Sequence, residues 1–173
     1  MTIYLRYAQH DDLPELLQII SSARQLLAEQ QIPQWQKGEG PNEEQLTHDI
    51  ALSQCYVLII DQKVAGLGVI STDQEPPYEN IKNGHWQHLT DSYAVIHRVA
   101  LNPIYQGKGT ALTLMNFLIT AARLNGHLDI RIDTHPKNVR MQRLIKKAGF
   151  SYRGDLLLPI PDGERLAYQL VLT

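Results

Sequence analysis

The sequence predicts a mixed α/β fold, with helices packed on a mostly antiparallel sheet in one domain covering residues 1–173. Three observations predict it. Short segments alternate apolar and polar residues, longer segments repeat apolar residues at helical spacing, and the early strands pair as a hairpin whereas later ones alternate with helices. The length of 173 residues suits one domain, and no linker or internal repeat divides it.

The first half reads as strand, helix, helix and hairpin. Residues 3–8 alternate like a strand, and residues 10–31 carry one apolar helical face that Asp11 or Asp12 can cap. Asn42 can cap a second helix, "EEQLTHDIALS". The runs "CYVLIID" and "KVAGLGVIST" then predict two strands joined by a turn at Asp61–Gln62.

The second half alternates strands and helices. "SYAVIHRVAL" (residues 92–101) predicts a long strand that Asn102–Pro103 ends. Residues 114–121 and 141–148 repeat apolar side chains at helical spacing, with "LDIRID" as a strand between them and "RLAYQLVL" as a final strand. Two loops, rich in Gly or Pro, carry the aromatic residues Trp35, Tyr78 and Trp86.

Composition excludes several classes of function. The net charge of −2 does not predict a nucleic-acid partner, and no apolar run is long enough for a membrane span. The N-terminus alternates and turns acidic, unlike a secretory signal. Cys55 is the only cysteine, which rules out an internal disulfide and fits a reducing compartment. We therefore expect a cytoplasmic protein without a membrane partner. A homodimer is compatible with the sequence.

The segment "IYQGKGTALT" (residues 104–113) joins the long strand to a helix. A helix start presents unpaired N–H groups and partial positive charge, and glycine lets an anion approach the backbone. The loop therefore predicts either a phosphate site or only a tight turn. It is not a Walker A loop, because no Gly-Lys-Ser/Thr ending is present, and it lacks the third glycine of a dinucleotide fingerprint.

The flanks of this loop favour the phosphate site. Residues 106–111, "QGKGTA", have the form Q/R-x-x-G-x-G/A and follow the strand "VIHRVALNP". Downstream, "LDIRIDTHPKNVRMQRLIKKAGF" gives a strand, an asparagine and a helix ending in Gly-Phe. From Tyr93 to Phe150 the chain resembles the GNAT superfamily of N-acyltransferases, and the first half resembles it more loosely. The resemblance implies a GNAT-like sheet of six or seven strands with a splayed central pair, flanked by about four helices.

The resemblance also implies how acetyl-coenzyme A, the acyl donor, would bind. The loop would wrap the pyrophosphate, and the pantetheine arm would pair with the edge of residues 99–101 as an added strand. Asn138 matches an asparagine that contacts the donor, although it is also placed to cap a helix. The implied donor-binding residues are Val99, Ala100, Leu101, Gln106, Gly107, Lys108, Gly109, Thr110, Ala111 and Asn138.

Acyl transfer to an amine needs a base, because a free amine resembles lysine, with a pKa of about 10.4. His97 matches one of two strand histidines in arylalkylamine N-acetyltransferases, whereas Val95 stands where others have a histidine or glutamate. His97 is therefore the candidate base; the alternative is a histidine packed in the sheet. The backbone N–H of Val99 is the candidate group that polarises the thioester carbonyl. Ile145 stands where the family often has a tyrosine acid.

Other polar residues leave alternatives open. Residues 133–135 end a strand near the implied meeting point of donor and acceptor, and they could act there or cap a turn. Arg98 should point to the opposite face from His97 in a regular strand. Trp35, Tyr78 and Trp86 could shape the acceptor pocket or pack elsewhere. The pair His85 and His88 lacks a third ligand, so we expect no metal.

The sequence thus predicts an enzyme that transfers an acetyl group from acetyl-coenzyme A to the primary amine of a small molecule. The amine would attack directly in a ternary complex. Two alternatives stay open. One is a module that binds acyl-coenzyme A without turnover, which the changed positions Val95 and Ile145 favour. The other is acetylation of a protein N-terminus or lysine.

Overall fold

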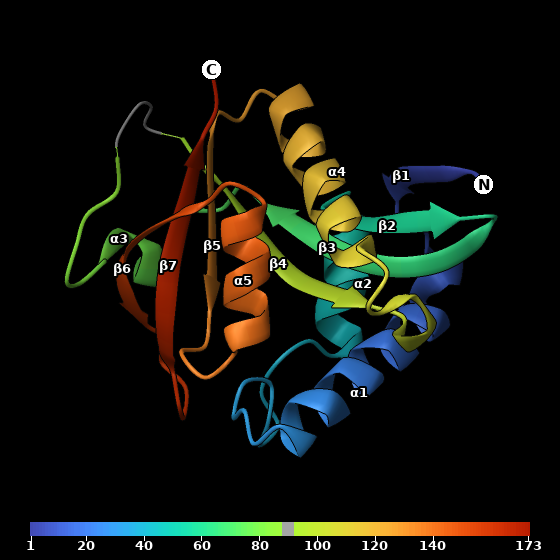
Figure 1. Cartoon of the computed structure of the whole chain (residues 1–173), viewed down its shortest axis with the longest axis horizontal. Helices are drawn as coiled ribbons and strands as arrows, with labels where there is room; N and C mark the ends of the chain where they lie inside the picture. Colours follow the sequence, from blue (N-terminus) through green and yellow to red (C-terminus); the bar gives the residue numbers. More distant parts are fainter. Residues whose placement is uncertain (88–91) are drawn as a thin grey trace.

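A computed structural model describes residues 1–87 and 92–173 as one open sheet with helices on both faces (Figure 1). The strand order is β1-β2-β3-β4-β5-β7-β6. The strands are β1 (Ile3–Tyr7), β2 (Cys55–Ile60), β3 (Lys63–Ser71), β4 (Ala94–Leu101), β5 (Asp129–Thr134), β6 (Ser151–Leu157) and β7 (Glu164–Val171). The helices are α1 (Leu13–Glu29), α2 (Glu43–Ala51), α3 (Pro76–Glu79), α4 (Thr110–Leu124) and α5 (Val139–Lys147), with 3-10 turns at His10–Asp12 and Pro103–Tyr105. The predicted mixed fold is confirmed, since the β4–β5 pair is parallel and the other pairs are antiparallel.

Local signals placed most elements correctly. The Asn42 side chain accepts a hydrogen bond from the Gln45 N–H at 2.9 Å and caps α2 as predicted. Asp61 and Gln62 form the tight turn between β2 and β3, both at positive φ. The expected side-chain cap of α1 is not formed. Asp12 occupies the cap position, but its carboxylate binds Arg6 at 2.7 Å instead.

Two elements have no clear signal in the sequence. Helix α3 is a single turn, too short for an apolar repeat, and it begins with two prolines that suit a first turn. Strand β6 is interrupted by a bulge between Tyr152 and Gly154, which breaks the alternation of its side chains.

The two faces of the sheet bury separate apolar groups. Helices α4 and α5 cover one face, where Leu114, Leu118 and Ile145 pack against Ile96 and Ile130. Helices α1 and α2 cover the other, where Leu16, Ile20 and Leu46 pack against β2 and β3. No helix in the described ranges has the length and apolar character to cross a bilayer.

Strands β4 and β5 diverge in the middle of the sheet, as the resemblance implied. Only two residue pairs join them, Ala94 with Ile130 and Val95 with Arg131. Beyond Val95, β4 keeps β3 as its neighbour but leaves its other edge without a strand partner. Figure 1 shows the two strands separating, with α5 in front of the gap. A β-bulge bends β4 further, and Arg98 in it has a φ of +55°.

A buried polar group sits where the two strands still pair. The Arg131 guanidinium donates to Asp129 at 2.8 Å and lies between the rings of Trp86 and Tyr93, at 4.3 and 3.8 Å from their centroids. The Gln169 amide of β7 donates to the same Asp129 carboxylate at 2.9 Å. These contacts tie β5 to β7 and to the loop that follows α3.

We predict that Arg131→Met lowers the free energy of unfolding by about 3 kcal/mol or more, because it leaves the Asp129 carboxylate buried without its cation. Chemical denaturation measures the loss. Arg123→Met, which changes an exposed arginine on α4, is the matched control and should leave stability unchanged. Equal stability of the two variants would contradict the structural role of this ion pair.

Candidate active site

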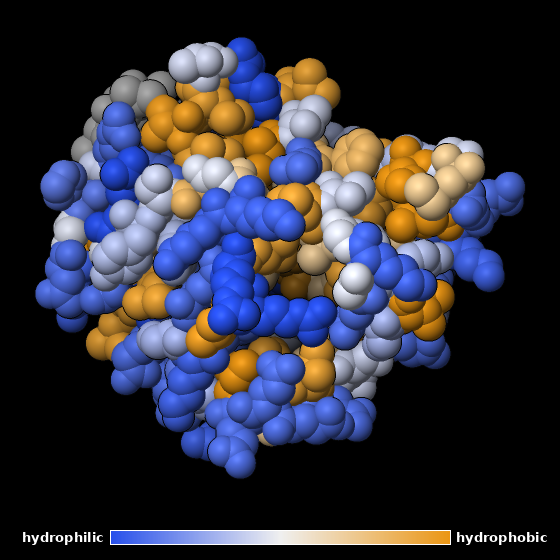
Figure 2. All heavy atoms as spheres, viewed as in Figure 1, coloured by the Kyte–Doolittle hydropathy of each residue, from blue (hydrophilic) through white to orange (hydrophobic). Residues whose placement is uncertain are grey.

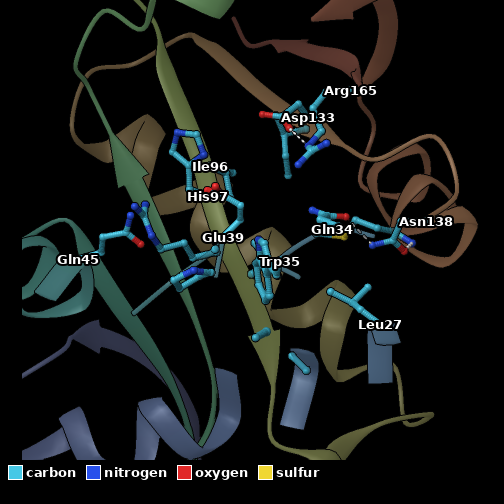
Figure 3. Close-up of a pocket in the computed structure, with 18 of the residues that line it drawn as sticks. Leu27, Gln34, Trp35, Glu39, Gln45, Ile96, His97, Asp133, Asn138 and Arg165 are labelled. Atoms are coloured by element: carbon cyan, nitrogen blue, oxygen red, sulfur yellow. Dashed lines mark hydrogen bonds and ion pairs between the residues drawn. The ribbon is translucent and has the colours of Figure 1, made fainter. Parts of the chain in front are cut away.

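A cavity of about 600 Å³ lies where β4 diverges from β5. We call it the β4–β5 cavity. Its walls come from β4 residues 96–101, from one face of α2, from the α1–α2 loop and from the start of α5. Figure 2 shows a hollow near the middle of this face, with apolar atoms inside and hydrophilic side chains around it. Figure 3 shows β4 crossing the cavity, with Asp133 and Arg165 on one side and Trp35 and Glu39 approaching from the α1–α2 loop.

One half of the cavity contains most of the residues implied to bind the donor. Six of them line it: Val99, Ala100, Leu101, Gln106, Ala111 and Asn138. Val99 and Leu101 are half-buried, whereas Ala100 is buried toward α1 on the other face of the sheet. This part of β4 has no β5 partner, so an extended ligand could hydrogen-bond to its backbone.

The glycine loop leads directly into α4. Gly107 and Gly109 have φ values of +74° and +77°, the left-handed region in which glycine is favoured. No side chain caps α4, and the Thr113 N–H donates to the Gly109 carbonyl at 3.2 Å. The first N–H groups of a helix have no partner within it, so the start of α4 offers donors to an anion. Lys108 is exposed in the same turn, and Thr110 is buried behind it.

Asn138 caps α5 and also contacts the opposite side of the cavity. Its side-chain oxygen accepts from the Met141 N–H at 3.1 Å, so the helix-cap prediction is confirmed. Its amide nitrogen donates to the Gln34 side chain at 3.1 Å (Figure 3). This hydrogen bond joins α5 to the α1–α2 loop across the cavity.

The other half of the cavity holds His97 and a carboxylate. His97 Nε2 lies 2.6 Å from Glu75 Oε1, and both residues line the cavity. Their side chains are 21% and 28% exposed, so the pair is shielded yet reachable. His97 is therefore not a histidine packed without access, and its partner belongs to the loop just before α3. No spacing pattern points to Glu75, because 22 residues separate it from His97.

A second polar group faces the cavity from β5. Asp133 accepts a hydrogen bond from the Tyr78 hydroxyl at 2.5 Å and lies 3.5 Å from the Arg165 guanidinium of β7. Burial raises the pKa of Tyr78 well above its ordinary value, and the Asp133 charge adds to that shift. The phenol is therefore protonated at neutral pH and donates to Asp133. Burial lowers the pKa of Arg165, while the Asp133 charge opposes that change.

The prediction that Arg98 points away from His97 is wrong. The β4 bulge breaks the alternation of side chains, so Arg98 lines the same cavity as His97. Its Nε lies 3.4 Å from Asp49 of α2. Burial raises the pKa of the Asp49 carboxyl, while the charges of Arg98 and His97 oppose the shift.

Comparison with known proteins identifies the family. A model described as the acetyltransferase (GNAT) family matches residues 20–150. The chain belongs to the GNAT acetyltransferase family. Membership implies acyltransferase activity. None of the curated proteins compared with the chain matches it.

Solved structures agree on the GNAT fold. An acetyltransferase of the GNAT family from Streptococcus agalactiae shares 31% identity, with a TM-score of 0.89, over 99% of this chain and 96% of that one. A putative acetyltransferase from Staphylococcus aureus shares 28% identity, with a TM-score of 0.71, over 98% and 99%. An aminoglycoside acetyltransferase in complex with coenzyme A shares 22%, with a TM-score of 0.67, over 98% and 95%, and supports the fold alone.

Two positions of this GNAT chain differ from the common pattern, and both are apolar and buried. Ile145 is fully buried in the core under α5, and Val95 is fully buried beside Tyr78. Neither can exchange a proton. Cys55 does not supply a nucleophile instead, because burial raises the pKa of its thiol to about 12.

The remaining candidate site residues differ in whether they line the cavity or pack in the core. Trp35 lines the cavity, whereas Tyr78 and Trp86 pack in the core beside β4 and β7. His135 caps a turn, since its Nδ1 accepts from the Lys137 N–H at 3.1 Å. His88 lies outside the described residues. Within the ranges 1–87 and 92–173, no group of three or more His, Cys, Asp or Glu side chains is arranged to hold a metal ion.

Proposed function

We propose that this GNAT protein transfers the acetyl group of acetyl-coenzyme A to the primary amine of a small molecule. The observation that carries the proposal is the continuity of the β4–β5 cavity. One end touches the start of α4 and the free edge of β4, and the other holds His97 beside Glu75. A donor thioester and an acceptor amine can therefore meet beside the His97–Glu75 pair. We also propose a cytoplasmic location, which the single buried thiol fits.

The donor would bind along the first half of this path. The pyrophosphate would accept hydrogen bonds from the backbone N–H groups of residues 107–111, next to the partial positive charge of the α4 terminus. The pantetheine amides would pair with residues 99–101, where β4 lacks a β5 partner. Asn138, at the cavity wall, would contact the donor beside its capping bond.

The chemical step would be direct attack by the amine. His97 accepts the proton of the attacking amine, the new C–N bond forms, and the C–S bond breaks to release coenzyme A as a thiolate. The backbone N–H of Val99 stabilises the oxyanion of the tetrahedral intermediate. A thiol has an ordinary pKa of about 8.5, so coenzyme A leaves as a thiolate without the tyrosine acid that Ile145 replaces.

The alternative that a specific observation favours is a module that binds acetyl-coenzyme A without turnover. Complete burial of Ile145 and Val95 removes two of the family's usual proton-transfer positions. A panel of small primary amines and N-terminal or lysine peptides, with release of the coenzyme A thiol as the readout, separates these functions. Enzymatic function predicts thiol release with small amines. Release only with peptides would indicate a protein acetyltransferase, and tight donor binding without release would indicate the module.

We predict that Gly109→Ala raises the Kd for acetyl-coenzyme A about tenfold. The new methyl group would face open space, with no protein atom within 4 Å, so the loss comes from the backbone at φ +77° and from the obstructed anion. Gly126→Ala at the other end of α4 is the matched control, because its φ is +90° and its surroundings are equally open. Calorimetric titration should show a change only for Gly109→Ala. Equal affinities would contradict the donor site.

We predict that His97→Ala lowers kcat about 10²- to 10⁴-fold and leaves the affinity for acetyl-coenzyme A near that of the unchanged protein. The reason is that His97 takes the amine proton but lies beyond the edge that holds the donor. Steady-state kinetics with the best amine of the panel, over about pH 6 to 9, measures the change. Turnover that stays the same throughout this range would exclude His97 as the base.

A further inference from the structure

We propose that Glu75 is a positioning residue for His97: its carboxylate fixes the imidazole ring and stabilises it once it has taken the amine proton. The inference rests on the proposed function for the role of His97 as base. The inference goes beyond the proposed function because it assigns a second residue, outside β4, to proton transfer.

The first support is the contact itself. Glu75 Oε1 and His97 Nε2 are 2.6 Å apart, which is the distance of a short, charge-assisted hydrogen bond. Both side chains are about three-quarters removed from solvent, so water weakens their attraction less than at an open surface. Nδ1 of His97 has no hydrogen-bond partner among the described residues and is free for a substrate.

The second support is the rigid frame around Glu75. Pro76 and Pro77 follow it directly and restrict the backbone as α3 begins. The Glu75 N–H donates to the Tyr93 hydroxyl at 3.4 Å, and its carbonyl accepts from the Tyr78 N–H at 2.9 Å. The fully buried Tyr78 ring in turn stands edge-on to His97, at 6.3 Å between centroids. The carboxylate therefore meets the imidazole from a fixed direction.

The third support is that three other carboxylates of this region, those of Asp49, Asp133 and Glu79, bind other groups. Asp49 pairs with Arg98, and Asp133 accepts from Tyr78 and faces Arg165. Glu79, one turn beyond Glu75, accepts from the Tyr93 hydroxyl at 2.8 Å. Among the residues that the structure describes, the Glu75 carboxylate has His97 as its only side-chain partner.

The arrangement gives each ring nitrogen one task. In the neutral imidazole, Nε2–H donates to Glu75, which leaves the lone pair of Nδ1 as the proton acceptor. When the amine attacks, its N–H bond breaks and an Nδ1–H bond forms, and the Glu75 carboxylate stabilises the resulting imidazolium. The proton remains on His97 until the product leaves, and the Glu75 carboxylate stays ionised throughout.

The experiment compares Glu75→Ala, Glu75→Gln and the matched control Glu29→Ala. We expect Glu75→Ala to lower kcat about 10²-fold with little change in the Kd for acetyl-coenzyme A, because the ring loses its orientation and its counter-charge. Glu75→Gln keeps an acceptor oxygen but no charge, so it should lose less. Added formate, which fits the space left in Glu75→Ala, should restore part of kcat in that variant and none in His97→Ala. Glu29→Ala removes the same charge from an exposed position on α1, outside the residues that hold Glu75, and should keep nearly full kcat.

The outcomes separate this inference from the proposed function. Full turnover in both Glu75 variants, with His97→Ala still inactive, would overturn the role of Glu75 alone. Full turnover in His97→Ala would overturn the base itself. If Glu75→Ala has a lowered melting temperature, Glu75→Gln provides the test instead. The proposal then requires that Glu75→Gln lowers kcat while its melting temperature stays near that of the unchanged protein. Formate restoring nothing in a folded Glu75→Ala would also overturn the proposal.

Discussion

The parallel pairing of β4 and β5 stops after two residue pairs, and the functional half of the molecule depends on that stop. A continued ladder would satisfy the β4 backbone from residue 96 onward and would close the cavity. Because it ends, the edge of residues 99–101 offers N–H and C=O groups to a ligand instead of to a strand. The bulge at Arg98 adds one residue there and turns Arg98 toward the side that His97 faces. The opening is thus a property of the backbone, and the side chains around it determine its chemistry.

Packing at the paired end of β4 and β5 keeps the opening in place. The buried Asp129–Arg131 pair and the rings of Trp86 and Tyr93 hold the paired end. The same Tyr93 supports the Glu75 backbone and stacks with Tyr78, which stands against His97. The residues that fix the sheet and those that orient the candidate base therefore belong to one cluster. A change at Tyr93 should affect both.

Local chemistry explains what the sequence could predict. The alternation in β5, the apolar stripe of α4 and the Asn42 cap depend on neighbours in the chain, so they are visible without a structure. The glycine loop is visible for the same reason. The Glu75–His97 pair is not, because 22 residues, with α3 among them, separate its members. The Arg98 bulge is hidden too, since arginine is not a residue that marks a left-handed backbone.

Hydrogen exchange with and without coenzyme A tests most directly whether the free edge of β4 is the donor site. The account predicts that amides in residues 99–101 and 107–111 slow their exchange when coenzyme A is added, because they gain hydrogen bonds from the ligand. Amides of β2, which lies two strands away, should not change. Saturating coenzyme A that leaves residues 99–101 unprotected would contradict the claim that this edge receives the donor.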